Sequence, residues 1–236
     1  ETYQRAINDQ LGLGLTLLGP SAVYLVRHGQ TEWNVERKWQ GVTDIPLNAR
    51  GRAQAAAVAR MFSSSGMFGG VAIRRVVSSD LSRAKETAHE IARVAGVPLE
   101  TTPRLRERSF GRWEGLSRSE IAQQFPGDIE AYETQRETFR PLGGQSWQEF
   151  SEQAARTVHD LVGDFAGQST VVVAHAGPLQ AFLSQVMGTR DSRQGRFMID
   201  NGSVSVVREW LNEHTGDRHW VVTALNITCH LHALES

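Results

Sequence analysis

The sequence has few of the features that mark exported or membrane proteins. It contains a single cysteine, Cys229, so no disulfide can form within the chain. No run approaches the ~18 consecutive apolar residues that a membrane-spanning helix needs. The apolar stretch 11–18 is interrupted by two glycines and lacks the basic start of a signal peptide. We therefore expect a soluble, cytoplasmic protein without a membrane partner.

The sequence also lacks an excess of positive or of negative charge. The formal net charge is -1, with 25 lysines and arginines against 26 aspartates and glutamates. This balance creates no basic field that would attract nucleic acid, so no nucleic-acid partner is expected. A site for a phosphorylated ligand would have to gather its positive charge locally. The 236 residues, 40% of them hydrophobic, suffice for a folded core.

The order of the expected elements indicates an α/β fold. The segments 22–27 and 170–174 are short, nearly continuous apolar runs, typical of strands buried on both faces of a sheet. Strands and helices alternate along the chain, which predicts a three-layer sandwich with a mostly parallel central sheet and helices on both faces. Further strands are expected at 75–78, 97–102, 203–210 and 219–226, and helices at 49–65, from Ser79 or Asp80 to 95, from Ser117, from Ser146 and after Gly177-Pro178.

Two segments fall outside this alternation. Residues 1–20 are interpreted as an N-terminal extension that ends at Gly19-Pro20. Residues 103–145 carry little strand signal and are interpreted as an inserted cap of helices and loops over the sheet. We expect residues 21–236 to form one domain that includes this cap.

Two histidines directly follow predicted strands. His28 follows the strand at 22–27, and His175 follows the strand at 170–174, each with a glycine within two residues. In open α/β sheets ligands bind beyond the carboxyl ends of the strands, and glycine lets the backbone approach them closely. A single histidine without such a setting is more often an ordinary surface or core residue than a functional one. We interpret four histidines in this ordinary way: His89, His159, His214 and His219. The paired setting of His28 and His175 indicates a site.

Charged residues that suit a phosphate occur near the same places. Arg27 adjoins His28, and Arg83 lies in the first turn of the helix expected after 75–78, where a guanidinium beside free helix N–H groups could bind a phosphate. Glu107 lies among arginines in a glycine-punctuated loop and is a candidate proton donor. Taken singly, Arg83 and Glu107 have a more ordinary explanation as solvated ion pairs.

Taken together, four segments resemble the ordered motifs of a known family. Arg27–Asn34, followed by Gln40-Gly41 and Asp44–Leu47, resembles the opening signature of the histidine phosphatase superfamily, phosphoglycerate-mutase-like branch. The segments Ser78–Ala88, Leu105–Gly115 and Val172–Gly177 resemble its second, third and fourth motifs. The resemblance covers about residues 22–210.

This resemblance implies a role for each matching residue. His28 would be the nucleophile that becomes phosphohistidine, and Glu107 would protonate the leaving alcohol. Since a carboxyl acid must be protonated when it acts, we expect an activity optimum at mildly acidic to neutral pH. Arg27, Arg83 and a protonated His175 would supply positive charge, so neither a metal nor another cofactor is expected. The substrate-binding residues would be Thr31, Asn34, Gln40, Gly41 and the backbone N–H of Ala176.

The third motif indicates hydrolysis rather than mutase chemistry. Its end, Phe110–Gly115, resembles the phosphatase members, and between 120 and 140 the arginines are Arg136 and Arg140, which form no convincing basic pair for a bisphosphate. We predict a phosphatase for a small phosphorylated metabolite. A 2,3-bisphosphoglycerate-dependent phosphoglycerate mutase and a non-catalytic phosphate-binding module remain as alternatives.

The tail Cys229–His232 lacks a tetrahedral ligand set, so no metal site is expected there. The oligomeric state is left open, with a homodimer as one option.

Overall fold

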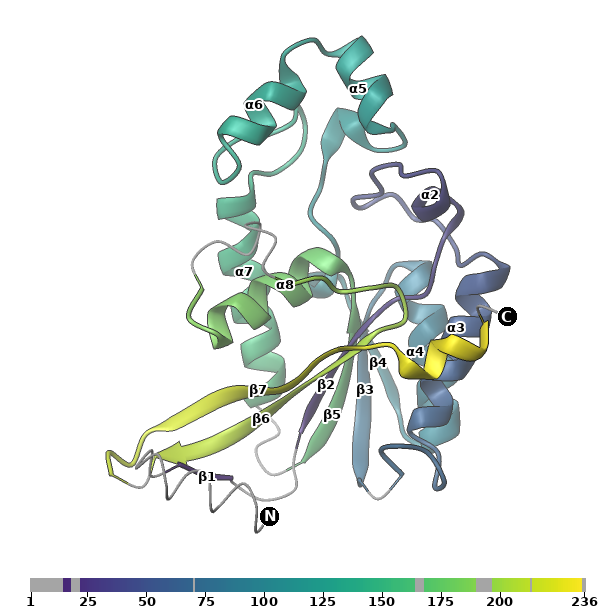
Figure 1. Ribbon diagram of the computed structural model, residues 1–236, viewed down its shortest axis with the longest axis vertical. Coiled ribbons are helices and arrows are strands. Elements are labelled where there is room, and N and C mark those ends of the chain that lie inside the picture. Colours follow the sequence, from purple (N-terminus) through teal and green to yellow (C-terminus); the bar gives the residue numbers. More distant parts are fainter. Residues whose placement is uncertain are drawn as a thin grey trace.

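The computed structural model describes residues 15–17, 22–69, 71–163, 168–189, 197–212 and 214–234. The fold is α/β, as the sequence predicts (Figure 1). Within the described residues, one sheet runs in the order β1-β6-β2-β5-β3-β4, and β7 pairs with the other edge of β6. The strands are β1 Leu15–Leu17, β2 Val23–Arg27, β3 Ile73–Ser79, β4 Leu99–Thr102, β5 Ser169–Ala174, β6 Val204–Asn212 and β7 Arg218–Ile227.

The centre of the sheet is parallel, whereas one side of it is antiparallel. β2, β5, β3 and β4 pair in parallel. β6 pairs antiparallel with β2, and β1 and β7 pair antiparallel with β6. The sheet is therefore mixed, and its parallel character belongs to the four strands that carry the predicted motifs. A hairpin such as β6–β7 can add to a parallel sheet because antiparallel neighbours need no crossover helix.

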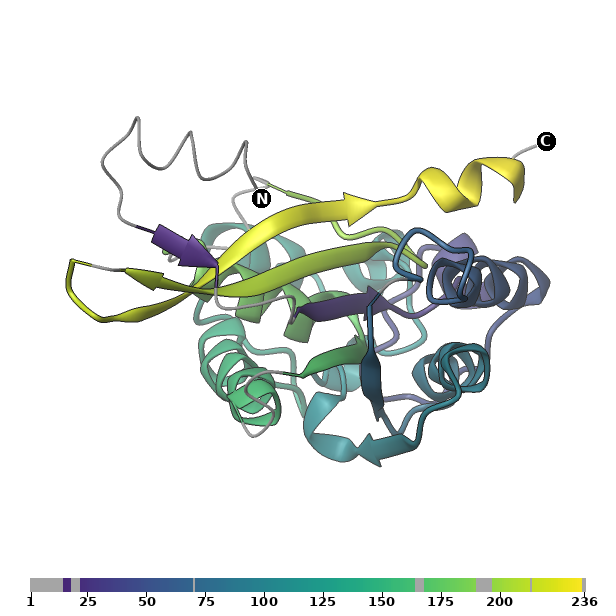
Figure 2. The ribbon, with the colours of Figure 1, turned by 90° about the horizontal axis from the view of Figure 1, so that it is seen from below.

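Helices cover both faces of the sheet (Figure 2). On one face lie α3 Ala49–Met61 and α4 Ser82–Ala95, and on the other lie α7 Trp147–Gly163 and α8 Ala176–Val186. Strand β2 serves both layers, because Tyr24 and Val26 pack into the first core and Val23 and Leu25 into the second. A strand buried on both faces has few polar positions, which explains the continuous apolar run in the sequence.

The start of α4 differs from the prediction. Neither Ser79 nor Asp80 is its N-cap; Leu81 occupies that position and makes no side-chain cap bond. The carboxylate of Asp44, from a distant loop, accepts hydrogen bonds from the backbone N and the hydroxyl of Ser82, at 2.7 and 2.8 Å. Asp80 instead pairs with Arg106 at 2.6 Å. Asp44 and Ser82 are 38 residues apart, so the sequence around the start of α4 contains no pattern that predicts this cap.

Several other helix boundaries follow the sequence closely, although the helix expected at 49–65 ends at Met61. Gly96 ends α4 in the left-handed conformation, with φ of 66°. Ser117 and Glu120 form a capping box at the start of α5 Arg118–Gln124. Ser146 and Glu149 exchange the same pair of bonds at the start of α7. These caps involve residues three apart, so the sequence alone could specify them.

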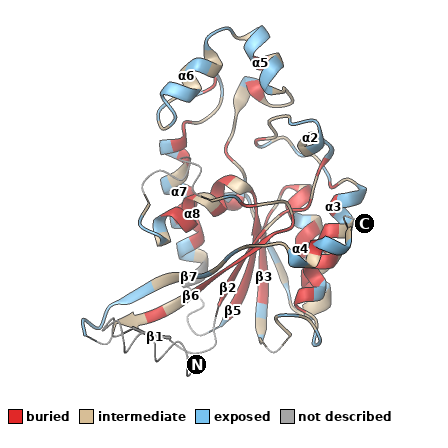
Figure 3. Ribbon diagram, viewed as in Figure 1, coloured by how far each residue is buried: buried red, intermediate tan, exposed pale blue. Residues whose placement is uncertain are grey.

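The expected cap region contains η1 Pro103–Leu105, η2 Gly111–Trp113, α5 and α6 Asp128–Thr134. In Figure 1, α5 and α6 lie beyond the carboxyl ends of the central strands, on the same side as the short helix α2 Glu32–Val35. Figure 3 shows buried residues concentrated in the central strands and the helix faces that cover them, whereas α5 and α6 are largely exposed. The fully buried ring of Trp113 stacks on Phe139, with centroids 5.3 Å apart, and its Nε1 donates to Asp128 at 2.9 Å.

The ends of the chain are described only in part. Of the expected extension 1–20, residues 15–17 form β1, and the remainder lies outside the described residues. The last element, η3 Cys229–Leu234, packs against α3. Among the described residues no helix is both long enough and apolar enough to cross a membrane.

Candidate active site

The two predicted histidines are neighbours because their strands are. Arg27 of β2 and Ala174 of β5 are register partners in a parallel pair, so the next residues, His28 and His175, leave the sheet side by side. Their ring centroids lie 5.1 Å apart at an angle of 59°. Their exposed fractions are 3% and 0%, so both imidazoles are held inside the protein.

The hydrogen bond of His28 determines which ring nitrogen is basic. Nδ1 lies 2.6 Å from the carbonyl oxygen of Gly29, which can only accept, so Nδ1 carries the proton and Nε2 keeps its lone pair. Burial holds the pKa of His28 well below its usual value, and the charges of Arg83 and Arg27 lower it further. His28 is therefore neutral at pH 7, with an unshared lone pair on Nε2.

Arg83 joins the second histidine to the loop after α2. The guanidinium is 1% exposed. Its Nε donates to Nδ1 of His175 at 3.2 Å, and its Nη1 and Nη2 donate to the carbonyl oxygens of Thr43 and Gly41, each at 2.8 Å. Burial lowers the pKa of Arg83 to about 10, which leaves it charged at neutral pH. The side chain thus combines a buried charge with a fixed orientation.

The state of His175 corrects the prediction that this ring is protonated. Because Nδ1 accepts from Arg83, the single proton of the neutral ring lies on Nε2, which is 2.9 Å from Oγ of Ser79. Burial, followed by the charge of Arg83, lowers the pKa of His175 well below its usual value. The positive charge of the site therefore comes from the arginines. Arg27 is the second of these, oriented by a bond from Nη1 to the carbonyl oxygen of Ile199 at 2.6 Å.

Glu107 is held by two backbone N–H groups. Oε1 accepts from the backbone N of Arg108 at 2.8 Å, and Oε2 accepts from the backbone N of Gly177 at 3.0 Å. Gly177 lies in the first turn of α8, and a Cβ at that position would stand 2.0 Å from Oε1. The glycine after His175 therefore provides the space for the carboxyl group.

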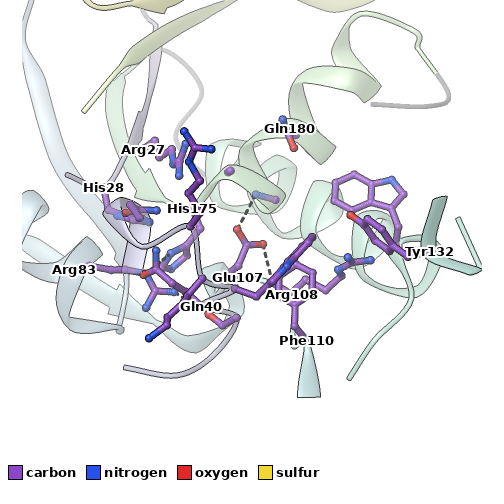
Figure 4. A pocket seen from close by; sticks show the side chains of 18 residues that line it. Arg27, His28, Gln40, Arg83, Glu107, Arg108, Phe110, Tyr132, His175 and Gln180 are labelled. Atoms are coloured by element: carbon purple, nitrogen blue, oxygen red, sulfur yellow. Dashed lines mark hydrogen bonds between the residues drawn. The ribbon is translucent and has the colours of Figure 1, made fainter. Parts of the chain in front are cut away.

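These side chains line one cavity of about 290 Å³ (Figure 4). At one end are both histidines, Arg27 and Arg83; Glu107 follows, and an aromatic wall forms the other end. The residues that line the cavity are Arg27, His28, Asn34, Arg37, Lys38, Trp39, Gln40, Gly41, Arg83, Glu107, Arg108, Phe110, Tyr132, Trp147, His175, Ala176, Gly177 and Gln180. A buried neutral imidazole, two guanidinium groups and a separate carboxyl form a set suited to phosphoryl transfer.

The comparison with known protein families agrees with this chemistry. The family model of the histidine phosphatase superfamily (branch 1) matches residues 23–228. The chain belongs to this superfamily. The match extends past the segment in which the motifs were found and includes β6 and β7.

Individual relatives cover nearly the whole chain. A protein of Salmonella paratyphi A named "Probable phosphoglycerate mutase GpmB" is 32% identical over 215 residues, which are 89% of this chain and 95% of the relative. The structure of mycobacterial glucosyl-3-phosphoglycerate phosphatase is similar with a TM-score of 0.72 at 28% identity, over 88% of this chain and 100% of that chain. The alpha-ribazole phosphatase from Shigella flexneri has a TM-score of 0.75 at 26% identity, over 87% and 96% of the two chains.

Nine of the ten predicted site residues line the cavity, and Thr31 does not. Thr31 is fully buried and is the N-cap of α2, where its Oγ1 accepts from the backbone N of Asn34 at 3.2 Å. It orients Asn34, because its own backbone N donates to Oδ1 of that residue at 3.0 Å. With Oδ1 engaged, Nδ2 of Asn34 is the amide atom available to a ligand.

Asn201 is a site residue that the sequence analysis missed. Its Nδ2 donates to the carbonyl oxygens of His28 and Gly29, at 3.1 and 3.4 Å, and lies 3.3 Å from Oδ1 of Asn34. It therefore fastens the loop that carries His28. Asn201 lies outside the four motifs, and an isolated asparagine before glycine suggests a turn and nothing more.

Glu114 was also missed, although it lies inside the third motif. Its carboxylate accepts from the backbone N of Val42, Thr43 and Phe110, at 3.2, 3.0 and 3.0 Å. It thereby ties the loop that holds Arg83 to the segment that carries Glu107. Only the position of Glu114 in the motif could have suggested this positioning role.

Proposed function

We propose that this protein is a phosphomonoester hydrolase that forms a phosphohistidine on Nε2 of His28. The observation that carries the proposal is the 2.6 Å bond between Nδ1 of His28 and the carbonyl oxygen of Gly29. This bond leaves the lone pair on the nitrogen that can attack phosphorus, within a cavity lined by Arg27 and Arg83. Two guanidinium groups can stabilise the charge on the transferring phosphoryl group.

The reaction has two steps. The lone pair on Nε2 of His28 attacks phosphorus, the bond from phosphorus to the ester oxygen breaks, and that oxygen takes the proton of the Glu107 carboxyl. Water then gives a proton to the Glu107 carboxylate and attacks phosphorus. The phosphorus–nitrogen bond breaks, its electron pair returns to Nε2, and inorganic phosphate leaves. Arg27, Arg83, the amide of Asn34 and the backbone N–H of Ala176 bind the phosphoryl oxygens.

Gln40 and Gly41 lie where the part of the substrate beyond the phosphoryl group would bind. Oε1 of Gln40 is buried and has no hydrogen-bond partner among the described residues. Because a buried acceptor without a donor is costly, this oxygen is a candidate for binding a substrate hydroxyl. The carbonyl oxygen of Gly41 already accepts from Arg83, so Gly41 shapes the loop rather than binding a donor.

Hydrolysis is favoured over mutase chemistry by the residues that line the cavity. Arg136 and Arg140 are not among them, and Arg140 forms an ion pair with Glu149. Mutase activity is the second candidate because the Salmonella relative bears that name. Conversion of 3- to 2-phosphoglycerate by the purified protein, at a rate exceeding phosphate release, would decide for the mutase. A non-catalytic module would release no phosphate from any monoester.

The proposed chemistry requires no metal, and its setting is a cytoplasmic enzyme acting on a small metabolite. Phosphate release from p-nitrophenyl phosphate with and without excess EDTA tests the metal requirement. Equal rates are expected, since the arginines supply the charge that a metal would otherwise provide. A rate abolished by EDTA and restored by a divalent cation would contradict metal independence.

The nucleophile is tested by labelling. The wild-type protein quenched in the steady state should carry an acid-labile, base-stable phosphoryl group, and His28→Ala should carry none and lose turnover. His159→Ala, an exposed histidine of α7, is the matched control and should behave as wild type. Near wild-type turnover by His28→Ala would refute the assignment.

A further inference from the structure

A short segment just before β6 supports two parts of the candidate active site. The carbonyl oxygen of Ile199 accepts the bond from Nη1 of Arg27 at 2.6 Å. Two residues later, Nδ2 of Asn201 donates to the carbonyl oxygens of His28 and Gly29, at 3.1 and 3.4 Å. This segment belongs to neither a helix nor a strand. Its position therefore depends on contacts with other parts of the chain.

The middle residue of the segment, Asp200, is held by Asn226 of β7. Oδ1 of Asn226 accepts from the backbone N of Asp200 at 2.8 Å, and Nδ2 of Asn226 donates to Oδ2 of Asp200, also at 2.8 Å. The amide thus binds the backbone and the side chain of one residue together. Because Asp200 lies between Ile199 and Asn201, fixing its position fixes both supports of the active site.

A β-bulge places Asn226 beside this segment. β7 runs along β6 (Figure 2), and the register shifts near the end of β7, so that Leu225 and Asn226 together oppose Ser205. Asn226 has a φ of 52°, and its backbone N donates to Oγ of Ser205 at 3.0 Å. Asparagine tolerates this left-handed conformation, and a bulge redirects a side chain from the regular alternation of a strand. The bulge therefore explains how an amide on the outer strand reaches Asp200.

Asp200 also affects the charge at the site. Burial lowers the pKa of Arg27, and the negative charges of Glu107 and Asp200 oppose this lowering. Glu107 lines the cavity, whereas Asp200 does not. Since Asn226 donates to the carboxylate of Asp200, it fixes the position of that charge relative to Arg27.

We infer that Asn226 is a positioning residue for phosphoryl transfer, acting through Asp200 on Arg27 and on the loop of His28. This inference rests on the proposed hydrolase function. Asn226 does not line the cavity, so it acts without touching the substrate. A displacement of about 1 Å at a reacting group can slow a reaction by roughly 10²-fold, so a support outside the cavity can still determine the rate.

Asn226→Gly removes the amide and keeps a residue that tolerates the positive φ. We expect kcat for p-nitrophenyl phosphate to fall by about tenfold or more, and Ki for inorganic phosphate to rise by about threefold or more, because Arg27 and the loop of His28 lose their support. Asn212→Gly is the matched control. Asn212 lies at the other end of the β6–β7 hairpin, where its Oδ1 accepts from two backbone N–H groups of the turn. This variant should leave both constants unchanged.

An exchange of the two side chains distinguishes a specific bond from a general loss of packing. Asn226→Asp places two carboxylates opposite each other and should reduce kcat more than Asn226→Gly does. Adding Asp200→Asn to Asn226→Asp restores one donor and one acceptor in reversed order, so the double variant should return to within about fivefold of the wild-type kcat. A double variant no better than Asn226→Asp alone would overturn the role of this pair.

Amide hydrogen exchange provides a measurement that does not depend on activity. In Asn226→Gly the amides of residues 27–29 should exchange faster than in the wild-type protein and in Asn212→Gly, because their loop is held less firmly. Unchanged exchange would overturn the action of Asn226 on this loop.

The outcomes separate this inference from the hydrolase itself. Wild-type kcat and Ki in Asn226→Gly would overturn the positioning role and leave the hydrolase standing. If the wild-type protein hydrolyses no monoester, the hydrolase fails, and the exchange of residues 27–29 decides whether Asn226 holds the loop. Faster exchange in Asn226→Gly would then support that role, and unchanged exchange would overturn it.

Discussion

Nε of Arg83 donates a hydrogen bond to Nδ1 of His175, 3.2 Å away, in the interior of the protein. The bond determines the tautomer of the histidine, because the proton of the neutral ring must then lie on Nε2. It also couples three segments, since the same guanidinium binds the carbonyl oxygens of Gly41 and Thr43. Arg83 therefore supports its neighbours, and in the proposed reaction it would also supply charge to the phosphoryl group.

Arg83→Lys tests whether activity requires the planar guanidinium group of Arg83 in addition to its positive charge. An ammonium cannot make the three bonds in their present directions, so we expect kcat for p-nitrophenyl phosphate to fall by about 10²-fold or more. Steady-state kinetics give the value, and circular dichroism checks the fold. Arg93→Lys is the control, because Arg93 lies on the same helix, is exposed and pairs with Glu90 on the surface. A loss below threefold in Arg83→Lys would show that charge alone suffices.

Glu107→Gln removes the transferable proton and keeps the shape of the side chain. We expect a fall of about 10²–10⁴-fold in kcat/KM for glycerol 3-phosphate, whose alkoxide needs a proton to leave. For p-nitrophenyl phosphate, whose phenolate leaves readily, the fall should be much smaller. The ratio of the two losses is the measurement. Equal losses for both substrates would mean that Glu107 does not protonate the leaving group.

Gly177→Ala should displace the acid without removing it, because the new Cβ would stand 2.0 Å from Oε1 of Glu107. The variant should show the same dependence on the leaving group as Glu107→Gln. The double variant should be no worse than Glu107→Gln alone, since both changes act on one proton transfer.

Gly96→Ala serves as the comparison for Gly177→Ala. Its φ is 66°, and a Cβ there would meet nothing within 4 Å. The Gly96→Ala variant should lose roughly 1 kcal/mol of stability through backbone strain, and its dependence of rate on the leaving group should stay unchanged.

For the double variant of Gly177→Ala and Glu107→Gln, additive losses of activity would argue that Gly177 does not act through the Glu107 carboxyl.

Stability should fall on mild acidification because two buried histidines have lowered pKa values. In the unfolded chain each ring titrates near pH 6.5, whereas burial keeps the folded pKa of His28 and His175 well below that value. Below pH 6.5 the unfolded chain binds protons that the folded chain does not. The free energy of unfolding should therefore fall by up to ~1.4 kcal/mol per pH unit for each ring, with no such effect above pH 6.5.

Urea unfolding followed by tryptophan fluorescence at pH 7.5, 6.5 and 5.5 measures this slope. His175→Asn removes one of the two groups, so its slope below pH 6.5 should be smaller by up to ~1.4 kcal/mol per pH unit. Identical slopes for the wild-type protein and His175→Asn would show that folding does not lower the pKa of His175.

Much of this protein could be predicted from short segments of sequence. The apolar runs of β2 and β5 specify strands buried on both faces, and the capping boxes at Ser117 and Ser146 start helices through residues three apart. Because both strands are parallel neighbours, the histidines that follow them meet in space. Each of these inferences depends on residues close together in the chain or on a general property of parallel sheets.

Tertiary structure decided what depends on distant partners. The amino end of α4 is capped by Asp44 rather than by Ser79 or Asp80, and Asn201 supports the loop of His28 from outside every motif. The neutral state of His175 follows from burial and from the direction of one Arg83 bond. Protonation state and hydrogen-bond direction arise from the field and geometry of the whole fold, so local sequence does not encode them.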